Sequence, residues 1–200
     1  MDSLIDAAIE GNSLRVRKVL QQGARPDTRD PYGETALTWA AYLGHTAVVK
    51  DMLAAGADRE ATGSFLGATP VILAAKGGHR GTVALLAVLA DVNARNSRGE
   101  TALMLALEQT EPSLKSPQRI LSILESLVHA EADVNLQDQE GNTALMRAVR
   151  WERVDIVRCL LSAGADVHLK DDAGQTALDW AVQWGGEEIA RLIYAAGEKE

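Results

Sequence analysis

The sequence predicts an all-α protein built as a row of about six helix–turn–helix units joined by hairpin-like loops. First, a Thr-(Ala/Pro)-(Leu/Val) tripeptide recurs at intervals of 34, 32, 42 and 33 residues, and an alanine follows the threonine of each copy five residues later. Second, an Ala-Asp pair recurs at intervals of 33, 42 and 33 residues. Third, the helices that fit between these markers are too short to be stable alone in water, so each unit must pack on its neighbours. The tripeptide begins at Thr35, Thr69, Thr101, Thr143 and Thr176, and the pair ends at Asp58, Asp91, Asp133 and Asp166.

The first two units show how each element is expected to begin and end. Residues 2–29 form a degenerate copy that is expected to cap the array. In the second unit, residues 30–61, an Asp-Pro-Tyr-Gly turn precedes Thr35, which is a typical N-cap residue for the first helix. Gly44 is expected to end that helix, and Gly56 is expected to end the second helix, because helices commonly close on a left-handed residue.

The two middle units depart from this pattern. The third unit, residues 62–95, has Leu89 where the helix-ending glycine is expected, and the fourth unit, residues 96–137, has Glu131 there. A residue other than glycine costs roughly 1–2 kcal/mol if it is forced into the left-handed conformation. We therefore expect these two turns to relax differently from the others.

The fourth unit also contains an insertion, residues 109–118, which is expected to form a loop between its two helices. Such a loop is either a tolerated surface feature or part of a binding edge. Its Ser116-Pro117 pair is a possible site of proline-directed phosphorylation. The fifth unit, residues 138–170, has no insertion, and the sixth, residues 171–197, carries the polar residues expected of a C-terminal cap.

The repeated pattern resembles the ankyrin repeat family. The resemblance covers about residues 2–197 and implies a single solenoid domain that serves protein–protein interaction. The family's loop histidine is absent from every copy of the tripeptide motif, which predicts weaker hydrogen bonding between repeats. The matching stretches are Gly33-Glu34-Thr35-Ala36-Leu37, Gly44-His45, Gly141-Asn142-Thr143-Ala144-Leu145 and Gly164-Ala165-Asp166-Val167.

Composition excludes several classes of protein. The chain of 200 residues is 46% hydrophobic and 24% charged, which is ordinary for a globular protein. Its net charge of −8 argues against a general nucleic-acid binder. No stretch approaches 18 consecutive apolar residues, and the N-terminus lacks the features of a signal peptide. These observations predict a cytoplasmic or other intracellular protein, and the single Cys159 excludes an internal disulfide.

Residues that could carry chemistry have structural interpretations. His45 and His79 occupy equivalent positions in neighbouring units, and helices about 8–10 Å apart are too far from one another to share a metal. Cys159 falls on the apolar side of a helix with no base beside it in the sequence. Asn93 and Asn135 occupy hairpin positions and are expected to be structural. The sequence therefore predicts no catalytic residue, metal or cofactor.

In the family, loop tips and first-helix faces form one concave binding side. Carried over by position, this side receives five of the eight aromatic residues, and it also receives Glu34 and Glu100; Trp39 and Trp180 are expected in the core. The alternative is that some of the aromatics only pack against neighbouring helices. Aromatic and arginine side chains are the types most often found as binding hot spots. The predicted partner-binding residues are Tyr32, Tyr42, Phe65, Lys76, Arg98, Arg150, Trp151 and Trp184.

The sequence thus predicts a non-catalytic module, monomeric on its own, that binds a partner protein through this concave surface. It predicts neither nucleic-acid binding nor a membrane span. Two alternatives remain open: a small-molecule or glycan binder in the same groove, and a regulatory subunit of an enzyme complex.

Overall fold

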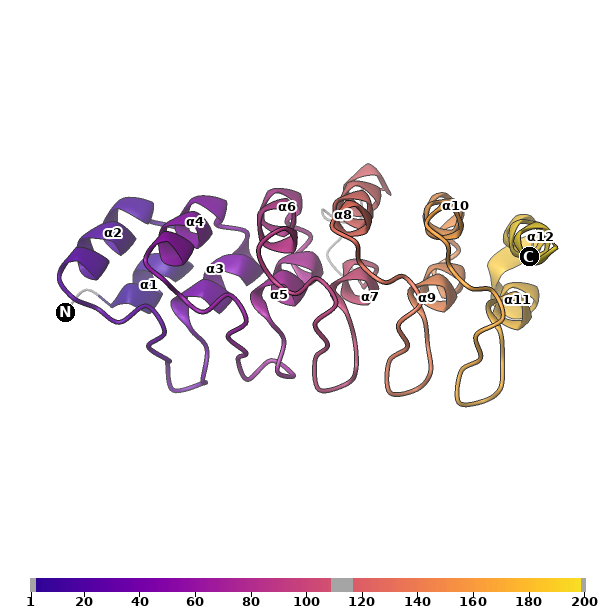
Figure 1. The fold of residues 1–200 in the computed structure, drawn as a ribbon, viewed down its shortest axis with the longest axis horizontal. Helices are drawn as coiled ribbons and strands as arrows, with labels where there is room; N and C mark the ends of the chain where they lie inside the picture. The colour runs from indigo at the N-terminus through magenta and orange to yellow at the C-terminus, as the bar shows by residue number, and fades with distance from the viewer. Residues whose placement is uncertain (1–2, 109–116, 199–200) are drawn as a thin grey trace.

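The computed structural model describes residues 3–108 and 117–198, which form a row of stacked helix pairs (Figure 1). The predicted all-helical class is confirmed, because in these ranges the only extended pairing is two isolated bridges, Arg29 with Thr35 and Lys170 with Thr176. The first helices of the pairs form an inner row, the second helices form an outer row, and the loops project beyond the inner row (Figure 1). The inner helices are α1 (Leu4–Ile9), α3 (Ala36–Leu43), α5 (Pro70–Lys76), α7 (Ala102–Ala106), α9 (Ala144–Arg150) and α11 (Ala177–Trp180). The outer helices are α2 (Ser13–Gln21), α4 (Thr46–Ala54), α6 (Arg80–Ala87), α8 (Pro117–His129), α10 (Val154–Ser162) and α12 (Gly186–Gly197).

The repeated threonine begins each inner helix from α3 onward. In four of the five copies its hydroxyl accepts a hydrogen bond from the backbone N–H three residues later, which satisfies a donor that the helix leaves free. Thr69 is the exception: Pro70 occupies the first helical position, and the Thr69 hydroxyl is buried without a hydrogen-bond partner. The four capping residues are Thr35, Thr101, Thr143 and Thr176.

The two turns without glycine behave differently from each other. Glu131 keeps the left-handed conformation, with φ of 63°, that Gly56 adopts with φ of 81°. Leu89 is not left-handed, and the backbone N–H groups of Leu89 and Ala90 both donate to the carbonyl of Leu86. The expected relaxation therefore occurs in the third unit and not in the fourth.

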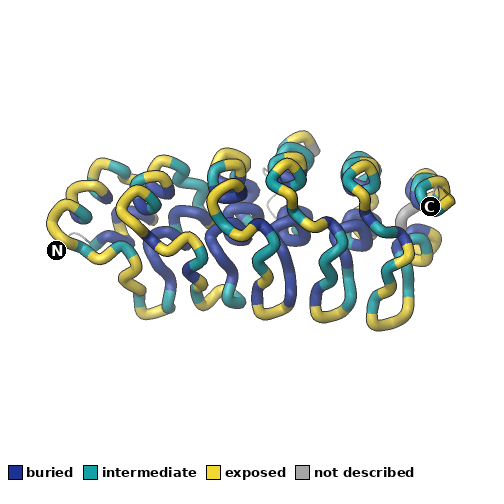
Figure 2. The backbone as a smooth tube through the Cα atoms, in the orientation of Figure 1, coloured by how far each residue is buried: buried dark blue, intermediate teal, exposed yellow. Residues whose placement is uncertain are grey.

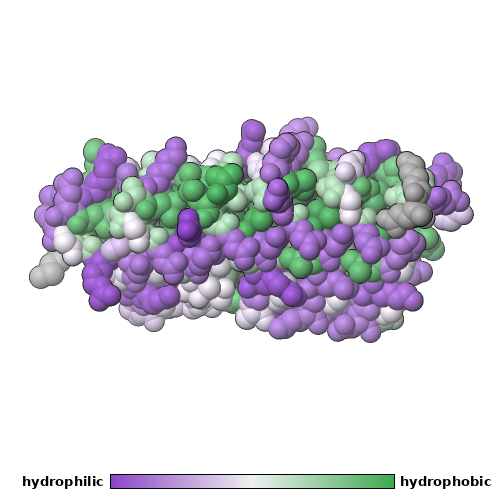
Figure 3. Space-filling view, viewed as in Figure 1, coloured by the Kyte–Doolittle hydropathy of each residue, from purple (hydrophilic) through white to green (hydrophobic). Residues whose placement is uncertain are grey.

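The core runs along the whole row between the inner and outer helices. The repeated alanines are fully buried, which lets neighbouring helices approach closely, and the leucines of the tripeptide lie beside them. In Figure 2 the inner helices are dark blue, and exposed yellow gathers on the outer helices and the loop tips. On the face seen in Figure 3, hydrophobic residues form a band along the helices above mostly hydrophilic loops. The alanines are Ala7, Ala40, Ala74, Ala106 and Ala148, and the leucines are Leu37, Leu103 and Leu145.

Hydrogen bonds join neighbouring repeats at the loops although the family's histidine is missing. A side-chain oxygen of one repeat accepts from the N–H of the Ala-Asp aspartate in the next repeat, at 2.8–2.9 Å, and we call this series the loop ladder. The histidines serve a similar structural role, since the Nε2 atoms of His45 and His79 lie 3.0 and 2.9 Å from the carbonyls of Ile9 and Tyr42. The ladder pairs Asp27 with Asp58, Glu60 with Asp91, Asn93 with Asp133, and Asn135 with Asp166.

The sixth and fourth units contain features that the repeat pattern did not anticipate. A π-helix, η2 (Ala181–Gly185), follows α11 directly and carries Trp184. Helix α8 begins at Pro117, so the last two residues of the predicted insertion 109–118 belong to a helix. The rest of the insertion, with Ser116, lies outside the described residues. No helix in the described ranges is both long and apolar enough to cross a bilayer.

Candidate protein-binding surface

Two cavities lie on the side of the array formed by the loops and the inner helices, which we call the inner face. The aromatic pocket, of about 350 Å³, lies between the second and third units. The polar pocket, of about 490 Å³, lies between the fourth, fifth and sixth units. The aromatic pocket is lined by Tyr32, Glu34, Thr38, Trp39, Tyr42, Ser64, Phe65 and Leu73. The polar pocket is lined by Arg98, Glu100, Glu108, Asp138, Gln139, Glu140, Asn142, Arg147, Arg150, Trp151 and Trp180.

The rings of the aromatic pocket come from three different elements and remain accessible. Tyr32 lies on the loop before α3 and is 73% exposed, Tyr42 lies on α3, and Phe65 lies on the loop before α5. The Nζ of Lys76 lies 4.7 Å from the centre of the Phe65 ring, which is a cation–π geometry. The predicted residues of the second and third units therefore lie together at one cavity.

The half-buried indole of Trp39 lines the same pocket and is fixed by the loop before it. Its Nε1–H donates to Oδ2 of Asp30 at 2.9 Å, and Oδ1 of Asp30 accepts from the backbone N–H groups of Tyr32 and Glu34. Burial disfavours the charged form of Asp30, but these hydrogen bonds outweigh it and lower the pKa of Asp30. The carboxylate thus orders both the loop and the ring.

Glu34 holds the two loops of the aromatic pocket together. Its Oε1 accepts from the hydroxyl of Ser64 at 3.0 Å and from the backbone N–H of Phe65 at 3.2 Å. Glu34 lines the pocket on the expected side of the array, but it is only 7% exposed. Glu100 likewise lines the polar pocket and is 5% exposed, because both side chains reach toward the following repeat.

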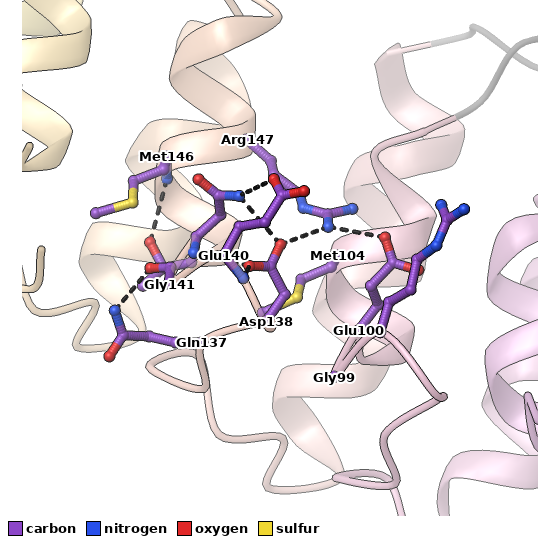
Figure 4. Close-up of polar contacts among 12 residues, drawn as sticks. Gly99, Glu100, Met104, Gln137, Asp138, Glu140, Gly141, Met146 and Arg147 are labelled. Atoms are coloured by element: carbon purple, nitrogen blue, oxygen red, sulfur yellow. Dashed lines mark hydrogen bonds and ion pairs between the residues drawn. The ribbon is translucent and has the colours of Figure 1, made fainter. Parts of the chain in front are cut away.

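An arginine paired with three carboxylates occupies the polar pocket, and Figure 4 shows its bonds to two of them, Glu100 and Asp138. Nη2 of Arg147 lies 2.8 Å from Glu100 and 2.7 Å from Asp138, and Nη1 lies 2.5 Å from Glu108. The bonds to Glu100 and Glu108 join the fourth unit to the fifth. Only 12% of the Arg147 side chain is exposed, so the pairs are formed largely out of water.

Pairing overcomes the cost of burying these charges. Burial disfavours the charged form of Asp138, but hydrogen bonds from Arg147 and from the backbone of Asn142 and Glu140 outweigh it and lower its pKa. Burial of Glu100 is likewise outweighed by hydrogen bonds from Asn96 and Arg147, so its pKa is lowered. Burial also disfavours charged Arg147, yet its bonds to Asp138 and Glu100 raise its pKa. All three groups are therefore held in their charged forms.

The other predicted residues lie around or beside the polar pocket. Arg98, Arg150 and Trp151 line it and are exposed. Trp184 does not line it but packs edge-to-face on Trp180, with ring centres 5.3 Å apart. Trp180 is buried as expected, and its indole donates to Asp171 at 2.9 Å.

Sequence reasoning missed the Arg147 cluster, although a signal for it was present. Asp30 occupies a loop position that recurs in each unit. Nine residues after this position, each unit has an inward-facing position on its inner helix. That spacing links Asp30 to Trp39, Asp138 to Arg147, and Asp171 to Trp180 by hydrogen bonds of 2.7–2.9 Å. The fifth unit has an arginine at the position where the second and sixth units have tryptophan. In those two units the aspartate nine residues earlier accepts a hydrogen bond from the indole, so the same aspartate beside an arginine indicates an ion pair.

The described residues give little support for metal binding or for a reactive cysteine. They contain no group of three or more His, Cys, Asp or Glu side chains that could hold a metal ion. Cys159 is half-buried, and burial, together with the charges of Glu125 and Asp155, raises the pKa of its thiol. A thiol shifted in this direction is a poor nucleophile, because the thiolate is the reactive form.

Stacked helix pairs with ordered loops on one side, and pockets between successive units, define a helical repeat protein of the solenoid type. A family model described as ankyrin repeats in three copies matches residues 4–96 and 113–200, so the chain belongs to the ankyrin repeat family. Such repeats are generally protein–protein interaction modules and typically non-catalytic scaffolds.

Two solved structures and one curated relative illustrate the similarity. An ankyrin repeat domain from Acinetobacter baumannii AYE is 28% identical, with a TM-score of 0.83 over 97% of both chains. The ankyrin repeat protein EF0377 is 28% identical, with a TM-score of 0.82 over 96% of both chains. Palmitoyltransferase Hip14 of Drosophila melanogaster is 34% identical over 97 residues, which are 48% of this chain and 15% of that protein. This chain therefore matches only a small part of the length of that relative.

Proposed function

We propose that the chain binds a partner protein through its inner face. The observation that carries this proposal is the presence of two cavities on one face, each lined by aromatic or arginine side chains. These are the residue types that most often dominate binding free energy when they are covered by a partner. The predicted residues are distributed over both pockets, so a partner that spans them would contact most of the array.

The order of the inner face favours tight association. Asp30, Asp138 and Asp171 each accept backbone hydrogen bonds within their own loop, so the loop tips are held in place by the protein itself. A preordered surface loses less conformational entropy on binding than a flexible one. The inner face is therefore suited to a partner that presents a matching surface or an extended segment.

The proposal is tested by comparing inner-face and outer-helix variants in partner capture. Immobilised wild type and two double variants, Tyr42→Ala with Phe65→Ala and Trp151→Ala with Trp184→Ala, are exposed to lysate of the source cell. Proteins that are captured are expressed separately and titrated against each variant. We expect helical circular dichroism to be unchanged and affinity to fall at least about tenfold, the effect of losing one hot spot of about 1.4 kcal/mol.

The matched control is a pair of exposed apolar residues of the outer row, Leu14→Ser on α2 with Val88→Ser directly after α6, which are 74% and 73% exposed. This variant should bind as wild type does. If the control weakens binding and both inner-face variants do not, the partner contacts the outer helices and the proposal is wrong.

A small-molecule ligand is the second candidate, and the aromatic pocket favours it. A cavity of about 350 Å³ falls within the usual range of ligand pockets, roughly 300–1,000 Å³. A ligand that binds the folded state raises the melting temperature, and the stabilisation grows with the logarithm of the ligand concentration above the dissociation constant. Thermal-shift screening of wild type against Tyr42→Ala with Phe65→Ala separates this candidate from protein binding.

A further inference from the structure

We propose that the aromatic pocket accepts an arginine side chain of the partner protein. This inference rests on the proposed function and deepens it, since it names the chemistry of one contact. Three features point to this guest: the equivalence between the two pockets, the open aromatic rings, and a buried carboxylate that lacks a cationic partner.

Glu34 and Glu100 occupy equivalent positions, each between the glycine of its loop and the threonine that caps the next helix. Glu100 receives the guanidinium of Arg147 from the following unit at 2.8 Å. The residue equivalent to Arg147 in the unit that follows Glu34 is Leu73, four residues after the repeated threonine of its own unit, Thr69. Leu73 lines the aromatic pocket together with Glu34. The structure thus repeats the carboxylate and omits the guanidinium.

No lysine or arginine in the described ranges forms an ion pair with Glu34. The polar groups that it does contact, the Ser64 hydroxyl and the Phe65 N–H, are neutral and both approach Oε1. The other carboxylate nearby, Asp30, is already engaged by Trp39 and by backbone N–H groups. A buried carboxylate without a cationic partner favours a guest that brings positive charge.

The surrounding rings suit a planar cation. Tyr32, Tyr42 and Phe65 are 73%, 40% and 39% exposed, so a guest can lie against their faces from the solvent side. A guanidinium stacks on an aromatic face while its N–H groups point outward in its own plane toward a carboxylate, and it is less strongly hydrated than an ammonium. Lys76, which already lies over Phe65, shows that this group of rings attracts a cation within the chain itself.

The direct test uses small probes on the full chain labelled with ¹⁵N. N-acetyl-arginine methylamide is titrated while the indole N–H of Trp39 is followed by NMR, with the indole of Trp180 as an internal reference. N-acetyl-citrulline methylamide has nearly the same shape without the charge, and N-acetyl-lysine methylamide has the charge without the plane. We expect the Trp39 signal to report at least fivefold tighter binding of the arginine probe than of either control probe.

Two substitutions tie the result to the proposed contact. Glu34→Gln retains an oxygen that can accept from Ser64 and Phe65 but removes the charge, and it should abolish the preference for arginine over citrulline. Leu73→Arg should supply the guanidinium from within the chain, as Arg147 does for Glu100, and should prevent the arginine probe from shifting the Trp39 signal. Trp151→Ala, in the other pocket, should leave the titration unchanged.

The outcomes separate this inference from the proposed function. Equal binding of the arginine and citrulline probes, or an unchanged preference in Glu34→Gln, overturns the arginine assignment. Equal binding of the lysine probe overturns the requirement for a guanidinium. If partner capture still depends on Tyr42 and Phe65 in those cases, the proposed function stands and only the guest is wrong. If capture is indifferent to both inner-face double variants, the proposed function itself fails.

Discussion

The aromatic pocket and the polar pocket are formed by equivalent parts of the repeat, yet one is lined mainly by rings and the other by ion pairs. At the inward-facing position of the inner helix, Trp39 lies in one pocket and Arg147 in the other, each bonded to the aspartate nine residues before it. The backbone at the two places follows the same pattern of turn, threonine cap and short helix. The comparison teaches that in this fold a single side chain per repeat sets the chemistry of the inner face.

Removal of the positive charge at the centre of the polar pocket is expected to have the largest effect on stability. Arg147→Met leaves Glu100 and Asp138 buried without their cation, and a broken buried ion pair typically costs about 3–5 kcal/mol. We expect the free energy of unfolding in urea to fall by that order. Arg150→Met, on the same helix but exposed, is the matched control and should change it by less than about 0.5 kcal/mol. A small effect of Arg147→Met would mean that the pocket tolerates unpaired carboxylates.

Acid should weaken the ion pairs of the polar pocket and reduce the difference in stability between wild type and Arg147→Met. A carboxyl whose pKa is lower in the folded chain than in the unfolded chain stabilises the fold above its unfolded pKa, and this stabilisation is lost as the pH falls through the folded pKa. Because the pKa values of Glu100 and Asp138 are lowered, wild type should lose stability below about pH 4. In Arg147→Met the same groups lack the cation that lowers their pKa. Urea unfolding of both proteins from pH 7 to pH 3 should show the gap between them narrowing, and a constant gap would contradict the pKa directions.

Removing the corresponding hydrogen bond in the aromatic pocket should lower the free energy of unfolding by a smaller amount. Trp39→Phe deletes the indole N–H that Asp30 accepts but leaves the carboxylate with its two backbone donors, so about 1 kcal/mol is expected. Trp180→Phe, which removes the equivalent bond to Asp171, should behave alike. Chemical denaturation measures both, and a loss as large as that of Arg147→Met would show that the two pockets are not stabilised differently.

The sequence predicted the repeated framework well because each of its signals is local. The N-caps at Thr35, Thr101 and Thr143 lie beside the groups they satisfy, and the buried alanines follow a fixed spacing. The placement of Tyr32, Tyr42 and Phe65 on one side of the array followed from the repeat register, although their role in binding stays a prediction.

What the sequence did not reveal depends on contacts between repeats. Glu100 and Arg147 are 47 residues apart and meet only because two units stack in register. Glu34 was placed on the concave side, but nothing in its own unit indicates that its carboxylate bonds to Ser64 and Phe65 of the next loop. The π-helix η2 has no local sequence signal that we recognise.

The smallest expected effect comes from the two helix ends that lack glycine. Glu131→Gly relieves a left-handed conformation that glycine adopts without strain and should stabilise the protein by roughly 0.5–1 kcal/mol. Leu89→Gly should bring no such gain, because Leu89 is not left-handed. Melting temperatures of the two variants decide this, and a gain from Leu89→Gly alone would reverse the assignment of the two turns.

The loop ladder has a consequence for how this chain can change in length. Three of its rungs join residues 31 positions apart, whereas the rung from Asn93 to Asp133 joins residues 40 positions apart with the same bond length of 2.8 Å. Extra residues have therefore entered the fourth unit without altering the hydrogen bond that joins its loop to the next one. Evolution, or an engineer adding a tag or a reporter domain, can lengthen the connection between α7 and α8 while the opposite edge keeps its register.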